Sequence, residues 1–331
     1  MQHGGLDFEP YANDPERWGA SMVHHAEVLI PCLDAVGAHR VIEVGAYAGD
    51  LTRVLIHWAK PAGAQIVAVD PSPQDELEEL AAENEQLELV RRTSLEALRE
   101  LPVPDALIID GDHNYYTVSE ELRVIAGRVS EDELPLLLFH DVCWPHGRRD
   151  DYFDLEQIPP HYRHPVAGED RGIYPGEPGV RPDGLPFPRS AEREGGARNG
   201  VLTAVEDFVD PRPDLQLAVV PAFFGFGAVW RKDAGYAEQL ARVLEPWIGH
   251  TLLARLEENR TRHLAEAHSL RVQLWHSQEL QRRQEEALRR LLRSSAFRLA
   301  ERLSKLRVRL GIAPGDTGVS REDIRRALEE T

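Results

Sequence analysis

Short apolar runs alternate with amphipathic stretches between residues 20 and 139 of the chain. Five of these runs have the length and composition of buried strands, and each ends in a polar or glycine-containing turn. The five runs are Arg40–Val44, Gln65–Val69, Leu87–Val90, Ala106–Ile109 and Leu136–Phe139. Such alternation is typical of βαβ units, so it predicts a parallel sheet. A ligand site is expected at the carboxyl edge of that sheet.

The pattern changes after the fifth run. Between Trp144 and Asn199 the periodicity disappears, and Pro, Gly, Arg and Asp dominate for roughly 50 residues. Regular structure resumes with a helix expected over residues 200–209. Two β-rich runs follow, Leu215–Val220 and Phe226–Trp230, around a turn rich in Gly and Phe. These runs predict an antiparallel hairpin that closes the sheet at one edge.

The last hundred residues or so have a third kind of composition. From residue 236 onward the chain is rich in Leu, Glu, Arg and Gln, which predicts long helices. Leucines recur at heptad positions, but the middle of the seam is polar, so a coiled coil is only weakly specified. We therefore predict a domain over residues 1–235, with its irregular stretch at 144–199, and a helical, coiled-coil-type tail over 236–331.

One segment of this tail is strongly basic. Residues 282–310 contain ten basic side chains against three acidic ones, with leucines at helical spacing. A basic amphipathic helix of this kind suits peripheral contact with an anionic membrane or an acidic partner. It also suits packing of the leucine face on its own domain or on a second copy, which gives a homodimer through the C-terminal helices. Packing on protein is the more common outcome.

Composition and charge exclude several classes of protein. With 42% apolar residues in 331, the chain is not disordered throughout. The formal net charge of −18 opposes general nucleic-acid binding. Segment 282–310 carries a net charge of +7, and the rest of the chain carries −25. The negative charge therefore opposes binding to anionic membranes for the rest of the chain but not for this segment. Two cysteines and the lack of a visible secretory signal predict a cytoplasmic protein.

The first candidate binding residues follow the first strand. Glu43, Gly45 and Gly49 form an acidic-x-Gly-x-x-x-Gly turn that opens a helix, whose free N–H groups can bind a carboxylate. The spacing differs from the G-x-G-x-x-G of dinucleotide-binding enzymes. Asp70 ends the second strand, where a carboxylate can accept hydrogen bonds from two ribose hydroxyls. Ser94 follows the third strand, where it would flank an adenine.

This arrangement resembles the class I S-adenosylmethionine-dependent methyltransferases across residues 20 to 230 or so. The resemblance implies an α/β fold with a Rossmann-like, doubly wound, mostly parallel seven-stranded sheet and an antiparallel C-terminal hairpin, here followed by a helical extension. It also implies S-adenosyl-L-methionine as cofactor, bound by Glu43, Gly45, Ala46, Tyr47, Gly49, Asp70, Ser94, Leu95 and Asp110. Taken without the resemblance, the residues also fit another nucleotide-binding α/β domain.

A second cluster of polar residues ends two neighbouring strands. Asp110, Asp112 and His113 follow the fourth strand, while His140 and Asp141 follow the fifth. Because parallel strands end at the same edge of a sheet, we expect these side chains to converge. Oxygen ligands with one imidazole suit Mg²⁺ or Mn²⁺ better than zinc. A lone aspartate at a strand end is more often a helix cap, but the clustering favours a functional site.

The cluster resembles that of the metal-dependent O-methyltransferases, which include catechol-type enzymes and enzymes acting on sugars and glycosides. The resemblance implies Asp110 and Asp141 as ligands of Mg²⁺ (or Mn²⁺), with His140 where relatives often carry a carboxylate. His140 also fits a hydrogen-bonding role with no metal. The general base is Asp112, which needs a metal to lower the pKa of the substrate hydroxyl, or His113, and the sequence does not separate the two.

These features predict a metal-assisted O-methyltransferase acting on a hydroxyl of a sugar, glycan or glycosylated natural product. The irregular stretch 144–199 directly follows the metal-binding strand, so it is placed to cover the acceptor as a lid. One alternative is a metal-independent methyltransferase with His113 or His140 as the base. Another is a non-catalytic scaffold in a glycan-assembly complex. The expected partners are a small-molecule or glycan acceptor and no nucleic acid.

Overall fold

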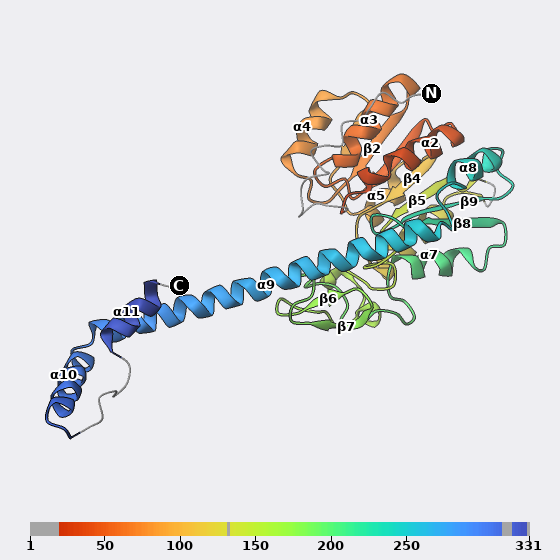
Figure 1. Cartoon of the computed structure of the whole chain (residues 1–331). Coiled ribbons are helices and arrows are strands. Elements are labelled where there is room, and N and C mark those ends of the chain that lie inside the picture. Colours follow the sequence, from red (N-terminus) through yellow and green to blue (C-terminus); the bar gives the residue numbers. More distant parts are fainter. Residues whose placement is uncertain (1–19, 131–132, 313–319, 330–331) are drawn as a thin grey trace. The chain divides into compact units, whose positions relative to one another are not determined.

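The computed structural model describes residues 20–130, 133–312 and 320–329 (Figure 1). The amino-terminal residues on which the expectation of no secretory signal depends lie outside these ranges. The chain divides into two compact units, Met1–Glu266 and Ala267–Thr331. The first unit holds the sheet and the candidate site, and the described part of the second unit is helical.

A seven-stranded sheet forms the centre of the first unit (Figure 1). Its strands are β1 (Arg40–Val44), β2 (Gln65–Val69), β3 (Leu87–Val90), β4 (Ala106–Ile109), β5 (Leu136–His140), β8 (Leu215–Val220) and β9 (Phe226–Arg231), in the spatial order β3-β2-β1-β4-β5-β9-β8. The first five strands pair in parallel, and β9 runs antiparallel to both β5 and β8. The predicted doubly wound, mostly parallel sheet with its C-terminal hairpin is confirmed.

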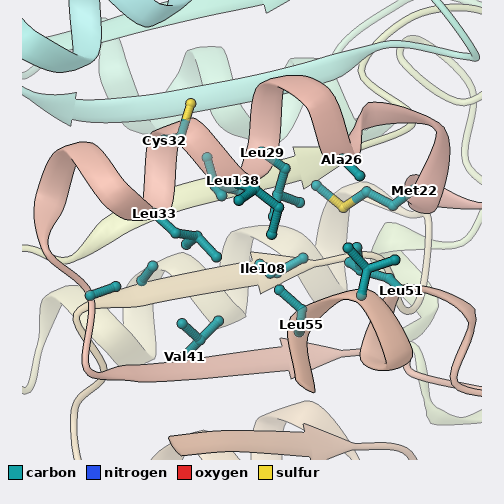
Figure 2. Packing of buried hydrophobic residues seen from close by; sticks show 14 of the residues in the cluster. Met22, Ala26, Leu29, Cys32, Leu33, Val41, Leu51, Leu55, Ile108 and Leu138 are labelled. Atoms are coloured by element: carbon teal, nitrogen blue, oxygen red, sulfur yellow. The ribbon is translucent and has the colours of Figure 1, made fainter. Parts of the chain in front are cut away.

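Helices cover both faces of this sheet. They are η1 (Met22–His25), α2 (Ala26–Val36), α3 (Asp50–Ala62), α4 (Asp75–Glu83), α5 (Ser94–Glu100), α6 (Tyr115–Ala126), α7 (Val201–Val209) and α8 (Ala237–Leu244). Successive strand residues face opposite sides, so Val41 joins the core under α2 and α3 while Ile42 joins the core under α5, α6 and α7. Figure 2 shows Leu29, Leu33 and Ile108 packed in the first of these cores.

The stretch between Trp144 and Asn199 is more ordered than its sequence indicates. It contains a hairpin of β6 (Gly172–Tyr174) and β7 (Glu177–Arg181), together with the turns η3 (Leu155–Gln157) and η4 (Pro160–Tyr162). The Arg149 side chain is fully buried and donates hydrogen bonds to the carbonyl oxygens of Ala191 and Pro178. A buried cation that binds backbone carbonyls leaves no periodic pattern in the sequence, so the prediction of an irregular stretch missed this order.

Three further helices follow α8. They are α9 (Thr251–Arg293), α10 (Ser295–Arg309) and α11 (Arg321–Glu329). The division between the two units falls within α9, and the first unit runs to Glu266. Within the second unit, Arg321 of α11 donates a hydrogen bond to the carbonyl of Leu292, and Ile324 is buried. No helix in the described ranges is both long enough and apolar enough to cross a bilayer.

Candidate active site

A cleft of about 510 Å³ opens at the carboxyl edge of the sheet, a volume in the usual range for small-molecule sites. Its walls come from the ends of β1, β2 and β4, from the starts of α5 and α6, and from the segment around η3. The lining residues are Val44, Gly45, Tyr47, Val69, Asp70, Pro71, Ser72, Gln74, Thr93, Ser94, Leu95, Asp110, Gly111, Asp112, Tyr116, Thr117, Phe153, Asp154, Gln157 and Ile158.

The turn after β1 brings two backbones together at the floor of this cleft. Gly45 has φ +83°, and its N–H donates to the carbonyl of Val69 at 2.9 Å. A Cβ at this position would lie 2.1 Å from the carbonyl oxygen of Asp110. Because both the φ angle and the close approach exclude a side chain, only glycine fits where the turns after β1 and β4 meet.

Asp70 forms one wall of the cleft. Its carboxylate is buried and accepts hydrogen bonds from the backbone N–H groups of Tyr47 and Ser72, both at 2.8 Å. These two bonds fix the orientation of the carboxylate, yet each oxygen keeps a second lone pair. Asp70 is therefore held where it can accept hydrogen bonds from ligand hydroxyls.

The residues predicted to bind the cofactor fall into two groups. Gly45, Tyr47, Asp70, Ser94, Leu95 and Asp110 line the cleft, whereas Glu43, Ala46 and Gly49 are not among its lining residues. The buried carboxyl of Glu43 instead accepts a hydrogen bond from the Thr52 hydroxyl at 2.7 Å, which joins β1 to α3. Burial raises the pKa of Glu43 to about 8. Glu43 thus supports the glycine turn from inside the protein.

Part of the cleft wall comes from the irregular stretch, in which the sequence marks the aromatic Phe153 but not Asp154, Gln157 or Ile158. Phe153, Asp154, Gln157 and Ile158 belong to the irregular stretch and line the cleft at and beside η3. The Phe153 N–H donates to Asp112 Oδ1 at 2.8 Å, which fastens this segment to the turn after β4. Apart from Phe153, the only sequence signal for this segment is its position after the fifth strand.

Asp110, His140 and Asp141 form a compact set of metal-ligating groups, in which one donor atom from each lies within 4.8 Å of the others. His140 Nδ1 is 3.0 Å from Asp110 Oδ1 and 3.3 Å from Asp141 Oδ2. His140 Nε2 is 3.0 Å from the carbonyl oxygen of Phe223. Since a carbonyl oxygen only accepts, Nε2 carries a proton and Nδ1 faces the two carboxylates.

A positive charge between Asp110, His140 and Asp141 would stabilise this metal-ligating set. Burial alone would lower the pKa of His140, but the carboxylates of Asp110 and Asp141 raise it well above its usual value. Burial alone would raise the pKa of Asp141, but His140 and His113 lower it. A buried carboxylate, Asp141, and a partly buried one, Asp110, are costly side by side without a cationic partner. Either a proton on Nδ1 or a divalent cation supplies one, so the donor set fits Mg²⁺ or Mn²⁺.

The two residues predicted as the base are placed differently. His113 Nε2 lies 3.4 Å from Asp110 Oδ1 and 3.3 Å from Asp141 Oδ2, beside the metal-ligating set. Burial would lower the pKa of His113, but these carboxylates raise it to about 9. Both oxygens of Asp112 accept hydrogen bonds, one from the Phe153 N–H and one from the Thr117 hydroxyl at 2.7 Å. His113 therefore lies against the metal-ligating set, whereas both oxygens of Asp112 are engaged in hydrogen bonds to the cleft wall.

The helix after β4 is capped by Asn114, so Asp112 does not have the capping role that a lone aspartate at a strand end usually has. Asn114 Oδ1 accepts a hydrogen bond from the Thr117 N–H and caps α6. Asp112 binds the hydroxyl of that same threonine and the Phe153 N–H, so it joins α6 to the segment that lines the cleft. Its interactions are thus those of a residue that shapes the cleft wall.

The comparisons with known proteins agree with this arrangement. Residues 42–142, which contain the glycine turn and all three members of the metal-ligating set, match the model of a methyltransferase domain family. No curated protein matches the chain in sequence. The sheet order confirms the predicted Rossmann-like fold, and the family match covers its first five strands.

Solved structures also resemble the chain, at low sequence identity. A methyltransferase from Podospora anserina bound to SAH shares 16% identity at a TM-score of 0.43, covering 70% of this chain and 90% of that one. A methyltransferase from Geobacter sulfurreducens shares 13% at 0.37, covering 69% and 91%. An O-methyltransferase family protein from Burkholderia thailandensis shares 12% at 0.36, covering 68% and 62%. Identities of this size concern the fold alone.

Proposed function

We propose that the chain is an S-adenosylmethionine-dependent O-methyltransferase that uses a divalent cation. One observation carries the proposal: Asp110 both lines the cleft and belongs to the metal-ligating set. A cofactor in the cleft and an acceptor oxygen at the cation would therefore be neighbours. Methyl transfer needs this proximity, since much of the rate acceleration comes from holding the two reactants in line.

The cofactor would bind through residues spread along the cleft. Asp70 accepts hydrogen bonds from the ribose hydroxyls, and Ser94 and Leu95 flank the adenine at the start of α5. Gly45 and Tyr47 lie at the turn after β1, where the methionine carboxylate can reach backbone N–H groups. Each of these residues lines the cleft, which supports the assignment.

In the reaction, Asp110, His140 and Asp141 would hold Mg²⁺ or Mn²⁺. Such a cation, when bound, would supply Lewis-acid chemistry that lowers the pKa of the acceptor hydroxyl and stabilises negative charge on its oxygen. His113, whose Nε2 lies beside Asp110 and Asp141, would be the group that takes the proton of this hydroxyl, with its own pKa lowered by the positive charge held there. The acceptor oxygen would then attack the methyl carbon as the carbon–sulfur bond breaks, to give a methyl ether and S-adenosylhomocysteine.

A hydroxyl of a sugar, glycan or glycosylated natural product is the acceptor that we favour. Tyr116 lines the cleft, and the centre of its ring lies 5.0 Å from the centre of the Tyr162 ring. The Arg198 guanidinium lies 5.1 Å from the centre of the Tyr162 ring. Aromatic faces beside a cationic donor suit the apolar faces and hydroxyls of a sugar ring.

The test combines binding and turnover. Isothermal titration should show S-adenosylmethionine binding to the wild type and weaker binding to Asp70→Ala. Transfer of a labelled methyl group to candidate sugars and glycans should stop with chelator and in Asp110→Asn and Asp141→Asn. Glu76→Gln, at an exposed acid of α4, serves as the matched control and should remain active.

Three outcomes would count against the proposal in different ways. No binding of S-adenosylmethionine would contradict a methyltransferase and favour a scaffold. Full transfer in the presence of chelator would contradict the cation and favour a histidine base alone. Transfer to nitrogen acceptors only would contradict the O-methyltransferase assignment.

A further inference from the structure

The loop between β8 and β9 contacts the metal-ligating set at His140. It contains Phe223 at φ +46° and Phe224 at φ +68°, both in the left-handed region that disfavours residues with a Cβ. Two successive bulky residues in this region persist only where the surroundings hold them there. The contacts of this loop show what holds it.

On its inner side, the loop is bonded to β5 and to the residues after that strand. The Phe223 carbonyl accepts the hydrogen bond from His140 Nε2, and the Phe224 carbonyl accepts one from the Cys143 N–H at 2.7 Å. These bonds lie on either side of Asp141 in the sequence. The loop therefore holds the His140 side chain on one side of Asp141 and the Cys143 backbone on the other.

On its outer side, the loop is held by the first part of α9. Glu257 is buried, and its Oε1 accepts a hydrogen bond from the Phe224 N–H at 2.9 Å. Arg260 donates to both Glu257 oxygens, at 2.6 and 2.7 Å, and its guanidinium lies 4.5 Å from the centre of the Phe224 ring. We call Glu257 and Arg260 the α9 clamp.

The two sides meet at a single peptide group. The carbonyl of Phe223 and the N–H of Phe224 belong to the same peptide bond, so this one unit donates to Glu257 and accepts from His140. A rotation of the peptide would break both hydrogen bonds at once. The negative charge of Glu257 also polarises the peptide, which makes the Phe223 carbonyl a stronger acceptor for His140.

We propose that Glu257 and Arg260 are positioning residues, which hold the Phe223 carbonyl so that it keeps the Nε2 proton of His140 and turns Nδ1 toward Asp110 and Asp141. The inference rests on the proposed function, because it gives this orientation the task of presenting a ligand to the cation. Hydrogen-bonding partners of a metal-binding histidine fix its tautomer and its ring orientation. Here that support comes from a residue 117 positions away from His140 along the chain.

The test uses three substitutions in the full chain. Glu257→Leu removes the acceptor of the Phe224 N–H, while Glu257→Gln keeps an acceptor but removes the charge and the pair with Arg260. Glu258→Leu is the matched control, since Glu258 is an exposed neighbour on the same helix that pairs with Arg262. Binding of S-adenosylmethionine, measured for each protein, shows whether the cleft is intact.

The first readout is Mn²⁺ binding by calorimetry. We expect Glu257→Leu to weaken Mn²⁺ binding by about ten- to a hundredfold and Glu257→Gln to fall between it and the wild type. Glu258→Leu should bind Mn²⁺ like the wild type. Equal Mn²⁺ affinity in all four proteins would overturn the proposal.

The second readout is the exchange of the His140 Nε2 proton, observed by NMR of histidine-labelled protein. In the wild type this proton should be protected from exchange, and in Glu257→Leu it should exchange faster. An unchanged His140 signal in Glu257→Leu would overturn the clamp. Absence of Mn²⁺ binding in the wild type would instead contradict the proposed cation, and the His140 signal would still decide the clamp.

Discussion

At Gly45, a single hydrogen in place of a side chain lets the turns after β1 and β4 meet. The Cβ of any other residue would enter the carbonyl of Asp110, which itself lines the cleft and belongs to the metal-ligating set. Relief of this overlap requires one of the two backbones to move. A change at Gly45 therefore alters the cofactor cleft and the candidate cation site together.

The substitution Gly45→Ala tests this. We expect a loss of at least about 2 kcal/mol in the free energy of unfolding and loss of S-adenosylmethionine binding, because steric overlap is added to an unfavourable φ. Chemical denaturation and calorimetry measure the two effects. Gly63→Ala is the control: Gly63 has φ +66° but open space around its Cβ position, so it should cost about 1 kcal/mol and leave binding intact. Equal effects of the two substitutions would refute the steric argument.

Glu43 makes stability depend on pH. Its pKa is raised by burial from 4.5 to about 8, so folding favours the protonated form. The stabilisation is complete below about pH 4.5, where both states are protonated, and it declines as pH rises toward 8. Between these limits the wild type should lose up to about 1.4 kcal/mol per pH unit relative to Glu43→Gln.

Urea denaturation at a series of pH values from 5 to 9 measures this difference. Glu43→Gln keeps an oxygen that can accept from Thr52, so the comparison isolates the titration. The control is Glu83→Gln, at an exposed position of α4, which should run parallel to the wild type. Parallel curves for Glu43→Gln and the wild type would refute the raised pKa.

The limits of prediction from sequence are visible at single residues. Asp70, Asp110 and Asp141 could be placed at the carboxyl edge because parallel strands end there. The pattern of apolar and polar residues does not indicate that Asp112 accepts a hydrogen bond from a backbone N–H 41 residues later. It also does not indicate that Glu257 accepts one from the peptide N–H after Phe223. Such bonds depend on how loops return to the sheet, and loops carry no periodic signal.

Among the elements, the stretch between Trp144 and Asn199 has the least regular structure and depends most on one side chain. The buried Arg149 binds two carbonyls within the stretch, and Glu194 lies 3.7 Å from its guanidinium. Strand positions were predictable to within a residue, because apolar runs of fixed length form them. The order in this stretch was not, because buried polar contacts between distant loops produce it.

Replacement of this arginine should loosen the stretch while the sheet stays intact. We expect Arg149→Met to reduce the free energy of unfolding by about 2 to 4 kcal/mol, because it removes the buried donor of the Ala191 carbonyl, the bond to the Pro178 carbonyl and the cation beside Glu194. Limited proteolysis should show new cleavage between residues 150 and 199. Arg193→Met, at an exposed position of the same stretch, should change neither. Cleavage at the same rate in both variants would show that Arg149 does not hold the stretch.

At the scale of the whole molecule, the chain combines a catalytic-type unit with a helical unit of different surface character. In α10 the inward face carries Phe297, Ser304 and Val308, all half-buried. The leucines of the opposite stripe are more than half exposed. These are Leu299, Leu303, Leu306 and Leu310, and five basic side chains of the helix stand against the single acid Glu301. Two such faces brought together would oppose like charges, so an anionic lipid surface suits this helix better than a second copy.

Vesicle flotation separates the two partners. The full chain should float with vesicles containing phosphatidylglycerol, less so at high salt, and not with phosphatidylcholine alone. Leu303→Glu should abolish flotation, whereas Leu270→Glu, at an exposed leucine of α9, should not. If sedimentation instead shows a dimer that Leu303→Glu dissociates, with no flotation, the second copy is the partner.

The double membership of Asp110 has a thermodynamic consequence. A residue that contacts two ligands links their binding equilibria. If the cation changes the affinity for the cofactor by some factor, the cofactor must change the affinity for the cation by the same factor. S-adenosylmethionine carries a positive sulfonium that the demethylated product lacks. A cation at Asp110 would therefore favour the product over the substrate form of the cofactor, and release of the product and of the cation would be coupled steps of one cycle.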